Sequence, residues 1–310
     1  MYRRKLEELN LLDDFLFGIM VTYPGIRERF SRKLLKIICR RKFGKLTIVA
    51  QKIYLGSDTD KHGTRLDVYL EEKASETGTD TTADNPEQED VVNATVYDVE
   101  PDKNDDKAAI AALPKRVRFY HAKIDGSSLQ SGETYHALKN VMIIMITPYD
   151  PFGRNRMVYT IKNGCVEEPD MPYEDGARTI FLYTRGEEGN PPEELQQLLR
   201  YMEHSTEENA CNEDLKELHR MVEEVKHDGE VSIEYMKIFE REEMLRKQGY
   251  REGEIKNLIQ LVSKKVKRGQ DCKTIATALE SDEVYIQNII DVVNRHAPEY
   301  DIDAIYEELK

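Results

Sequence analysis

Carboxylates recur at the ends of β-rich segments, and their spacing is suited to binding a divalent cation. Asp67 lies in the middle of the second predicted strand, and Glu100 ends the third. Because alternate residues of a strand share one face, Asp98, Glu100 and Asp102 are expected to point the same way. Converging carboxylates hold hard cations such as Mg²⁺, with Mn²⁺ as a substitute, and the cation offsets phosphate charge and generates hydroxide. The pattern predicts a site for phosphodiester hydrolysis, although single carboxylates near strand ends are also common in turns.

The sequence predicts the elements that would position these side chains. Apolar residues with a period of about 3.6 favour helices, and β-branched runs with period two favour strands. In chain order the predicted elements are a helix at 26–41, strands at 46–55, 64–71 and 94–100, a helix from Pro114 to Asp125, and strands at 141–147, 157–161 and 179–183. This alternation predicts an α/β fold in which a mixed sheet is flanked by helices.

Two regions are expected, because the pattern changes near residue 190. Residues 1–190 would form the α/β core, and 73–93 would be a flexible acidic insertion because it has almost no large apolar side chain. Residues 191–310 have a helical pattern throughout, which predicts an all-helical C-terminal region. Within it, 272–293 has the spacing of a helix-turn-helix, but its second helix is acidic. This favours packing, or a homo-oligomer formed through the tail, over reading of DNA.

A net charge of -14 would repel nucleic acid at long range, so DNA binding needs a local basic face. Two candidates exist: the basic run within residues 25–45, and a cluster on the helix predicted to begin at Pro114. On that helix the residues placed to contact DNA are Arg116, Arg118, Tyr120 and Lys123. Arg can bind a phosphate bidentately. The alternative is a helix that packs Val117 and Phe119 inward and keeps its cations in water.

Several separated segments together resemble a known nuclease family. They are LLDDFLFG at 11–18, GTRLDVY at 63–69, VYDVE at 96–100, LPKRVRFY at 113–120 and PYDPFG at 148–153. Their types and order resemble the PD-(D/E)XK nuclease superfamily, which has a restriction-endonuclease-like fold, and more closely its transposase-related, recombination-promoting nuclease branch. The resemblance implies a Mg²⁺-dependent DNA endonuclease. It also implies that Asp67 and Glu100 are metal ligands, together with the backbone carbonyl of Pro101.

Asp102 departs from the family pattern. The superfamily usually has Lys at this position and the branch often has Gln, so the charge is inverted here. Asp102 can add a metal ligand but cannot stabilise charge on a phosphate, a task for which Lys103 or Lys115 would have to be recruited. The alternative is a nuclease fold that has lost catalysis and binds DNA or a protein. Asp14 matches an acidic position in the family's first helix, and an N-cap role is the other interpretation.

Signals for other chemistries are missing from the sequence. The four cysteines have no C-x-x-C spacing and the histidines form no H-E-x-x-H motif, which disfavours zinc and redox-dithiol sites. A phosphate-cradling loop and a serine-hydrolase elbow are also absent. The charged N-terminal segment and the lack of a long apolar run predict neither a signal peptide nor contact with a membrane. The expected location is therefore the cytoplasm.

Overall fold

The structure is a computed structural model of the chain, and its two compact units are described separately. It describes residues 4–43, 46–50, 53–54, 64–65, 68–72, 94–129 and 131–310. The first unit is Met1–Ser232 and the second is Ile233–Lys310. The predicted acidic insertion at 73–93 lies outside the described residues, and so does Asp67.

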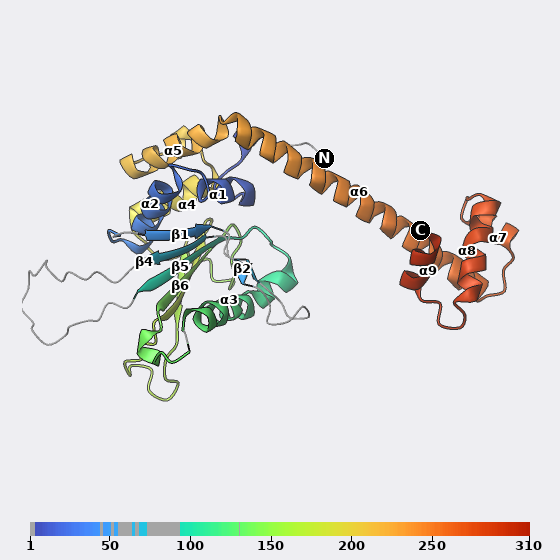
Figure 1. Ribbon diagram of the computed structural model, residues 1–310, viewed down its shortest axis with the longest axis horizontal. Coiled ribbons are helices and arrows are strands. Elements are labelled where there is room, and N and C mark those ends of the chain that lie inside the picture. The colour runs from blue at the N-terminus through green and yellow to red at the C-terminus, as the bar shows by residue number, and fades with distance from the viewer. Residues whose placement is uncertain are drawn as a thin grey trace, which may run out of the picture. The chain divides into compact units, whose positions relative to one another are not determined.

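A mixed sheet lies at the centre of the first unit (Figure 1). Its strands are β1 (Leu46–Ala50), β4 (Val68–Glu72), β5 (Thr95–Pro101), β6 (Asn140–Thr147), β7 (Val158–Lys162) and β8 (Ala177–Tyr183). Among the described strands the order is β1-β4-β5-β6-β8-β7. β5, β6 and β8 are parallel, whereas β1, β4 and β7 are antiparallel to their neighbours. The predicted α/β class and mixed sheet are confirmed.

Each of the first two predicted strands corresponds to two shorter strands among the described residues. The segment expected to form a strand at 46–55 contains β1 and β2 (Ile53–Tyr54), and the one expected at 64–71 contains β3 (Thr64–Arg65) and β4. β2 and β3 form a separate antiparallel pair. This pair keeps the register of β1 with β4. The extended conformation is therefore confirmed for the described parts of both segments.

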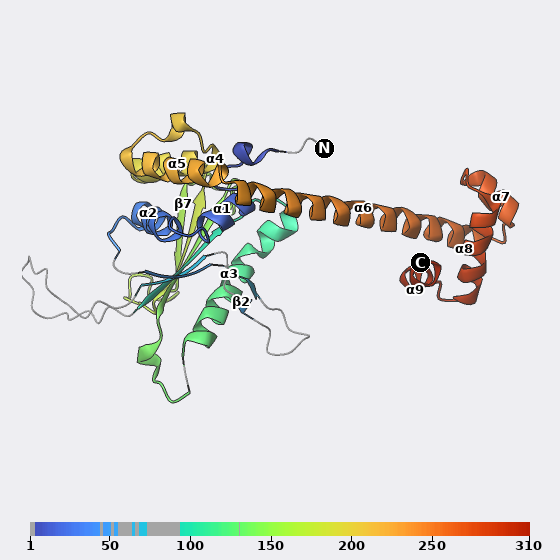
Figure 2. The same ribbon diagram turned by 45° about the horizontal axis from the view of Figure 1, so that its top comes forward.

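One face of the sheet is covered by α3 (Lys107–Ser128), which connects β5 to β6 and packs against β6 (Figures 1 and 2). The residues buried together there are Tyr69, Val96, Leu113, Val117, Ile124, Val141, Ile143, Met145 and Phe181. Because Val96 of β5 belongs to this cluster, Asp98 and Glu100 lie on the same face. The predicted division of β5 into two faces is confirmed.

α3 begins at Lys107 rather than at Pro114 and ends at Ser128, so the predicted limits of this helix are wrong. Its N-cap, Asp106, accepts hydrogen bonds from two backbone N–H groups of the first turn, at 2.9 and 3.0 Å. The alanines that follow have the highest helix propensity. Capping and propensity together outweigh the hydrogen bond that is lost at Pro114.

Helices also cover the opposite face of the sheet, where α2 contacts β1 (Figure 1). They are α1 (Asp14–Met20), α2 (Arg27–Cys39) and α4 (Glu193–Glu203), with α5 (Glu213–Lys226) packed on α1 and α2. The predicted helix at 26–41 is confirmed as α2. Short 3-10 turns occur at Leu6–Glu8, Tyr135–Ala137 and Glu207–Asn209. Because α4 and α5 bury their leucines in the first unit, that unit extends to Ser232, and the expected boundary at residue 190 is wrong.

The second unit is helical, as the sequence predicts. It contains most of α6 (Gly229–Val266), followed by α7 (Cys272–Ala278), α8 (Glu283–Arg295) and α9 (Ile302–Leu309). The end of α6 packs with the other three around Ile259, Ile275, Ile286, Ile289 and Ile305. In the described parts of both units, none of the helices is long and apolar enough to cross a bilayer.

Candidate active site

Glu100 and Asp98 place two carboxylates on the face of the sheet that α3 covers. Glu100 is 6% exposed and lies opposite Met145 of β6, and Asp98 is fully buried. Pro101 ends β5 immediately after Glu100. Burial of acidic groups at a strand end is costly unless they have partners or ligands. Asp67, the predicted second metal ligand, is not among the residues that the structure describes.

Asp102 continues this edge and binds a cation from α3. Its backbone N–H donates to the carbonyl of Ile146 at 2.9 Å, so the ladder with β6 extends beyond Pro101. Its side chain is 11% exposed and forms an ion pair with Arg116, and its negative charge acts on the hydroxyl of Tyr149. Burial, followed by the charge of Asp102, raises the pKa of Tyr149 and keeps the phenol protonated. The end of β5 thus carries an edge cluster made of the ion pair of Asp102 with Arg116 and of Tyr149, whose hydroxyl is influenced by both charges.

Neither lysine proposed from the sequence lies in this cluster. Lys103 binds Asp13 through its Nζ atom at 2.6 Å from Oδ1. Lys115 is exposed, and among the described residues it forms no hydrogen bond or ion pair. The cation that the structure brings to position 102 is therefore Arg116, which the sequence suggested only as a DNA contact.

Asp14 is an electrostatic neighbour of the same edge. It is the first residue of α1, and the N-cap position is occupied by Asp13, so the N-cap interpretation of Asp14 is wrong. Its pKa is raised by partial burial first and then by the negative charges of Asp102 and Asp13, while Lys103 opposes the shift. The negative charges next to α1 and after β5 therefore act on Asp14 at this end of the sheet.

The residues of α3 that were expected to face DNA have different surroundings. Arg116 points to Asp102, and Tyr120 packs against the core cluster under α3. Arg118 is exposed, and the Nζ atom of Lys123 lies 5.3 Å from the centre of the Phe119 ring. Phe119 itself is 36% exposed, so the alternative in which it packs inward is wrong, although Val117 is buried. Lys115 and Arg118 are consequently open to solvent, as is Lys107 at the start of α3.

The other basic run, on α2, is paired with acidic residues. Lys33 binds Asp214 and Glu217 of α5 at 2.8 and 2.7 Å, and Lys36 binds Asp214 at 2.7 Å. Arg29 reaches Glu217 at 3.3 Å. At the end of α2, a hollow of about 360 Å³ is lined by Lys36, Ile37, Arg40, Arg41, Lys42, Pro192, Glu194 and Asp214. Most charge on this helix therefore holds α5 in place.

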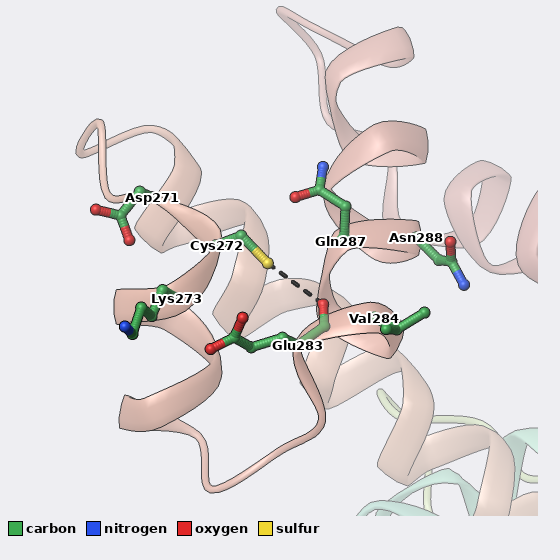
Figure 3. Close-up of a pocket in the computed structure, with 7 residues that line it drawn as sticks. All are labelled: Asp271, Cys272, Lys273, Glu283, Val284, Gln287 and Asn288. Atoms are coloured by element: carbon green, nitrogen blue, oxygen red, sulfur yellow. Dashed lines mark hydrogen bonds between the residues drawn. The ribbon is translucent and has the colours of Figure 1, made fainter.

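The second unit has a hollow of about 480 Å³ between α7 and α8, in which Cys272 is the reactive residue type (Figure 3). Its Sγ donates to the backbone carbonyl of Glu283 at 3.3 Å. Burial, and then the charges of Glu283 and Asp271, raise the pKa of this thiol. A thiol held protonated in this way is a poor nucleophile.

Sequence reasoning missed Tyr149 as a member of the edge cluster. The signal was present, because Tyr149 is the second residue after the buried strand β6 and Asp102 directly follows its parallel neighbour β5. Carboxyl ends of adjacent parallel strands meet at one edge of a sheet.

Within the described ranges no group of three His, Cys, Asp or Glu side chains could hold a metal ion. Comparisons with family models, with curated proteins and with solved structures found no match to this chain.

Proposed function

We propose that this chain is a Mg²⁺-dependent DNA endonuclease of the recombination-promoting kind within the PD-(D/E)XK superfamily. The observation that supports it best is the buried Glu100 at the end of β5, next to the ion pair of Asp102 with Arg116. Acidic and cationic groups at one strand end suit a phosphodiester and its metal. Carboxylate oxygens are the donors that Mg²⁺ prefers, so the chemistry of Glu100 fits the cofactor.

Asp67 and the carbonyl of Pro101 would complete the metal site with Glu100. This part of the proposal requires the antiparallel register of β4 and β5, in which Tyr69 faces Asp98, to continue for two more residues. Tyr69 belongs to the cluster under α3, on the face that carries Glu100. With that register, the alternation of a strand would put Asp67 on the same face.

Hydrolysis transfers no electrons and needs only water as the second reactant. The oxygen of water bonds to phosphorus, the bond from phosphorus to the departing sugar oxygen breaks, the water proton passes to solvent and the leaving oxygen takes one up. Bound Mg²⁺ offsets phosphate charge and lowers the pKa of water. Glu100 and Asp67 would hold the metal at the strand end, and exposed Lys115 and Arg118 would attract the DNA backbone.

Nicking of supercoiled plasmid by the full-length protein tests this function. The wild type is expected to nick with Mg²⁺ and not with EDTA, and Glu100→Gln and Asp67→Asn are expected to abolish nicking. Glu71→Gln is the matched control, because Glu71 is a carboxylate of β4 that pairs with Lys139 at 2.7 Å, away from Glu100. Equal nicking by the wild type and Glu100→Gln would refute the proposal.

A second candidate is a nuclease fold that binds DNA without cutting it. The observation in its favour is Asp102, because its carboxylate ties up Arg116 and adds negative charge where DNA would bind. This candidate predicts a wild-type protein that does not nick with Mg²⁺ or Mn²⁺ but binds duplex DNA with strong salt dependence.

A further inference from the structure

Arg116 is the best-positioned cation at the end of β5. Its side chain is 33% exposed, and one Nη atom forms the ion pair with Asp102. The Nε atom is buried and has no hydrogen-bond partner among the described residues. Because Nε is closed to solvent, the donors that a phosphate oxygen can reach are those on the exposed part of the guanidinium. Asp102 holds the guanidinium through this ion pair.

We propose that Arg116 contacts the scissile phosphate and supplies the positive charge that Asp102 cannot, while Asp102 positions it. The inference rests on the proposed endonuclease function. A guanidinium presents several N–H donors in one plane, so Asp102 can hold one end while another donor meets a phosphate oxygen. Arg116 is thus assigned as a catalytic residue, and Asp102 as the residue that fixes its orientation.

The same geometry disfavours the two lysines. Lys103 is held by Asp13 at 2.6 Å, so it would have to break an ion pair to reach the phosphate. Lys115 precedes Arg116 on α3 and is exposed, whereas Arg116 lies toward the sheet. Neighbouring residues of a helix point about 100° apart, so both cannot face Asp102.

Steady-state nicking by full-length variants with Mg²⁺ tests the assignment. Arg116→Gln is expected to lower kcat about 100- to 1,000-fold, with a smaller change in KM. This is the range caused in other enzymes by the loss of one preorganised hydrogen-bond donor. Arg116→Lys keeps the charge without the planar fork and is expected to lose about tenfold. Arg185→Gln is the control, because Arg185 also donates to a carboxylate, Glu203, at 2.8 Å, and is expected to keep the wild-type rate.

A rescue experiment separates charge supply from a structural role. Position 102 is in contact with the Arg116 guanidinium, so a lysine there places an ammonium close to the same point. Asp102→Lys in the Arg116→Gln background is therefore expected to restore much of the lost rate. Asp102→Asn alone is expected to lower kcat about tenfold, and to have no further effect when Arg116 is already Gln, because the two residues act as one unit.

The outcomes separate this inference from the proposed function. Loss of nicking in Glu100→Gln with a wild-type rate in Arg116→Gln overturns the role of Arg116 and leaves the endonuclease intact. Failure of Asp102→Lys to raise the rate of Arg116→Gln also overturns it. If the wild type does not nick, the proposed function fails and the inference fails with it. Thermal unfolding of each variant is measured first, and Arg116→Lys, which can keep the ion pair, carries the test if Arg116→Gln does not fold.

Discussion

α2 and α3 are both rich in basic residues, but their charges have different partners. On α2, Lys33, Lys36 and Arg29 are bound by carboxylates of α5. On α3, Arg116 is bound at the end of β5, while Lys115 and Arg118 face solvent. The two helices lie on opposite faces of the sheet (Figure 1). The shorter helix α2 carries as many Lys and Arg residues as α3 and is therefore the more densely basic of the two, yet α3 has more charge available to a ligand.

This difference shows that a run of basic residues indicates a binding surface only when the acidic partners of those residues in the fold are known. Ion pairs with α5 bind three of the basic residues of α2, so these charges stabilise the fold. The basic residues of α3 include Arg116, which pairs with Asp102 at the end of β5, and under the proposed function this charge would act on a phosphate. The comparison predicts that charge removed from α3 weakens DNA binding, whereas charge removed from α2 weakens folding.

The largest effect is expected from removing exposed charge on α3. Lys115→Gln, Arg118→Gln and Lys123→Gln combined should lower affinity for a DNA duplex about a hundredfold at 0.1 M salt, because a protein that neutralises fewer phosphates releases fewer counterions from the duplex. The slope of log affinity against log salt should become shallower by about 2 to 3. Fluorescence anisotropy across a salt series measures both quantities.

The matched control is the same number of charges removed from α2, as Arg29→Gln, Arg32→Gln and Lys36→Gln. Its affinity for the duplex and its salt slope should equal those of the wild type. If the α2 variant loses affinity and the α3 variant does not, the comparison is reversed, and the DNA surface lies on the other face of the sheet.

Much of the fold could be predicted because its signals are local. The apolar run of β6 and the alternation of β5 gave the strands and the face of Glu100 correctly. The start of α3 was wrong, because Pro114 is a strong signal for a first helical turn and Asp106 a weaker one. The extent of the first unit was also wrong, since α4 and α5 have the same helical pattern as the tail and only their packing on α2 shows where they belong.

The candidate site was less predictable, because its pairs join distant parts of the chain. The pairing of Asp102 with Arg116 depends on α3 crossing the end of β5, which no spacing reveals. The ion pair of Lys103 with Asp13 likewise could not be predicted without knowing where α1 lies. Residue types in the sequence suggested the carboxylates at the end of β5, whereas only the three-dimensional structure showed that Arg116 is the cation beside them.

A smaller effect is expected from Lys33 of α2. Its side chain is 16% exposed and lies between Asp214 and Glu217, so Lys33→Ala leaves two carboxylates facing each other. We expect a loss of about 1–2 kcal/mol in the free energy of unfolding, between the values for exposed and buried pairs. Urea unfolding measures it, and DNA affinity should not change. Lys216→Ala, which removes an exposed pair with Glu213, should have no measurable effect. Equal stability of all three proteins would contradict a structural role for the charge on α2.

The smallest effect concerns the acid stability that this pairing confers. Hydrogen bonds from Lys33 first, and then from Lys36, lower the pKa of Asp214 below its ordinary value of 3.8. A carboxyl group whose pKa is lowered in the folded state stabilises the protein at pH values above the ordinary pKa of that group. This contribution disappears as the pH falls through the lowered pKa. Asp214→Asn should therefore reduce stability at pH 7, by less than about 1 kcal/mol because the side chain is partly exposed, and flatten the loss of stability below pH 4. Urea unfolding between pH 7 and pH 3 measures this, with exposed Asp170→Asn as the control. An unchanged pH profile in Asp214→Asn would show that the contact between α2 and α5 rests on apolar packing alone.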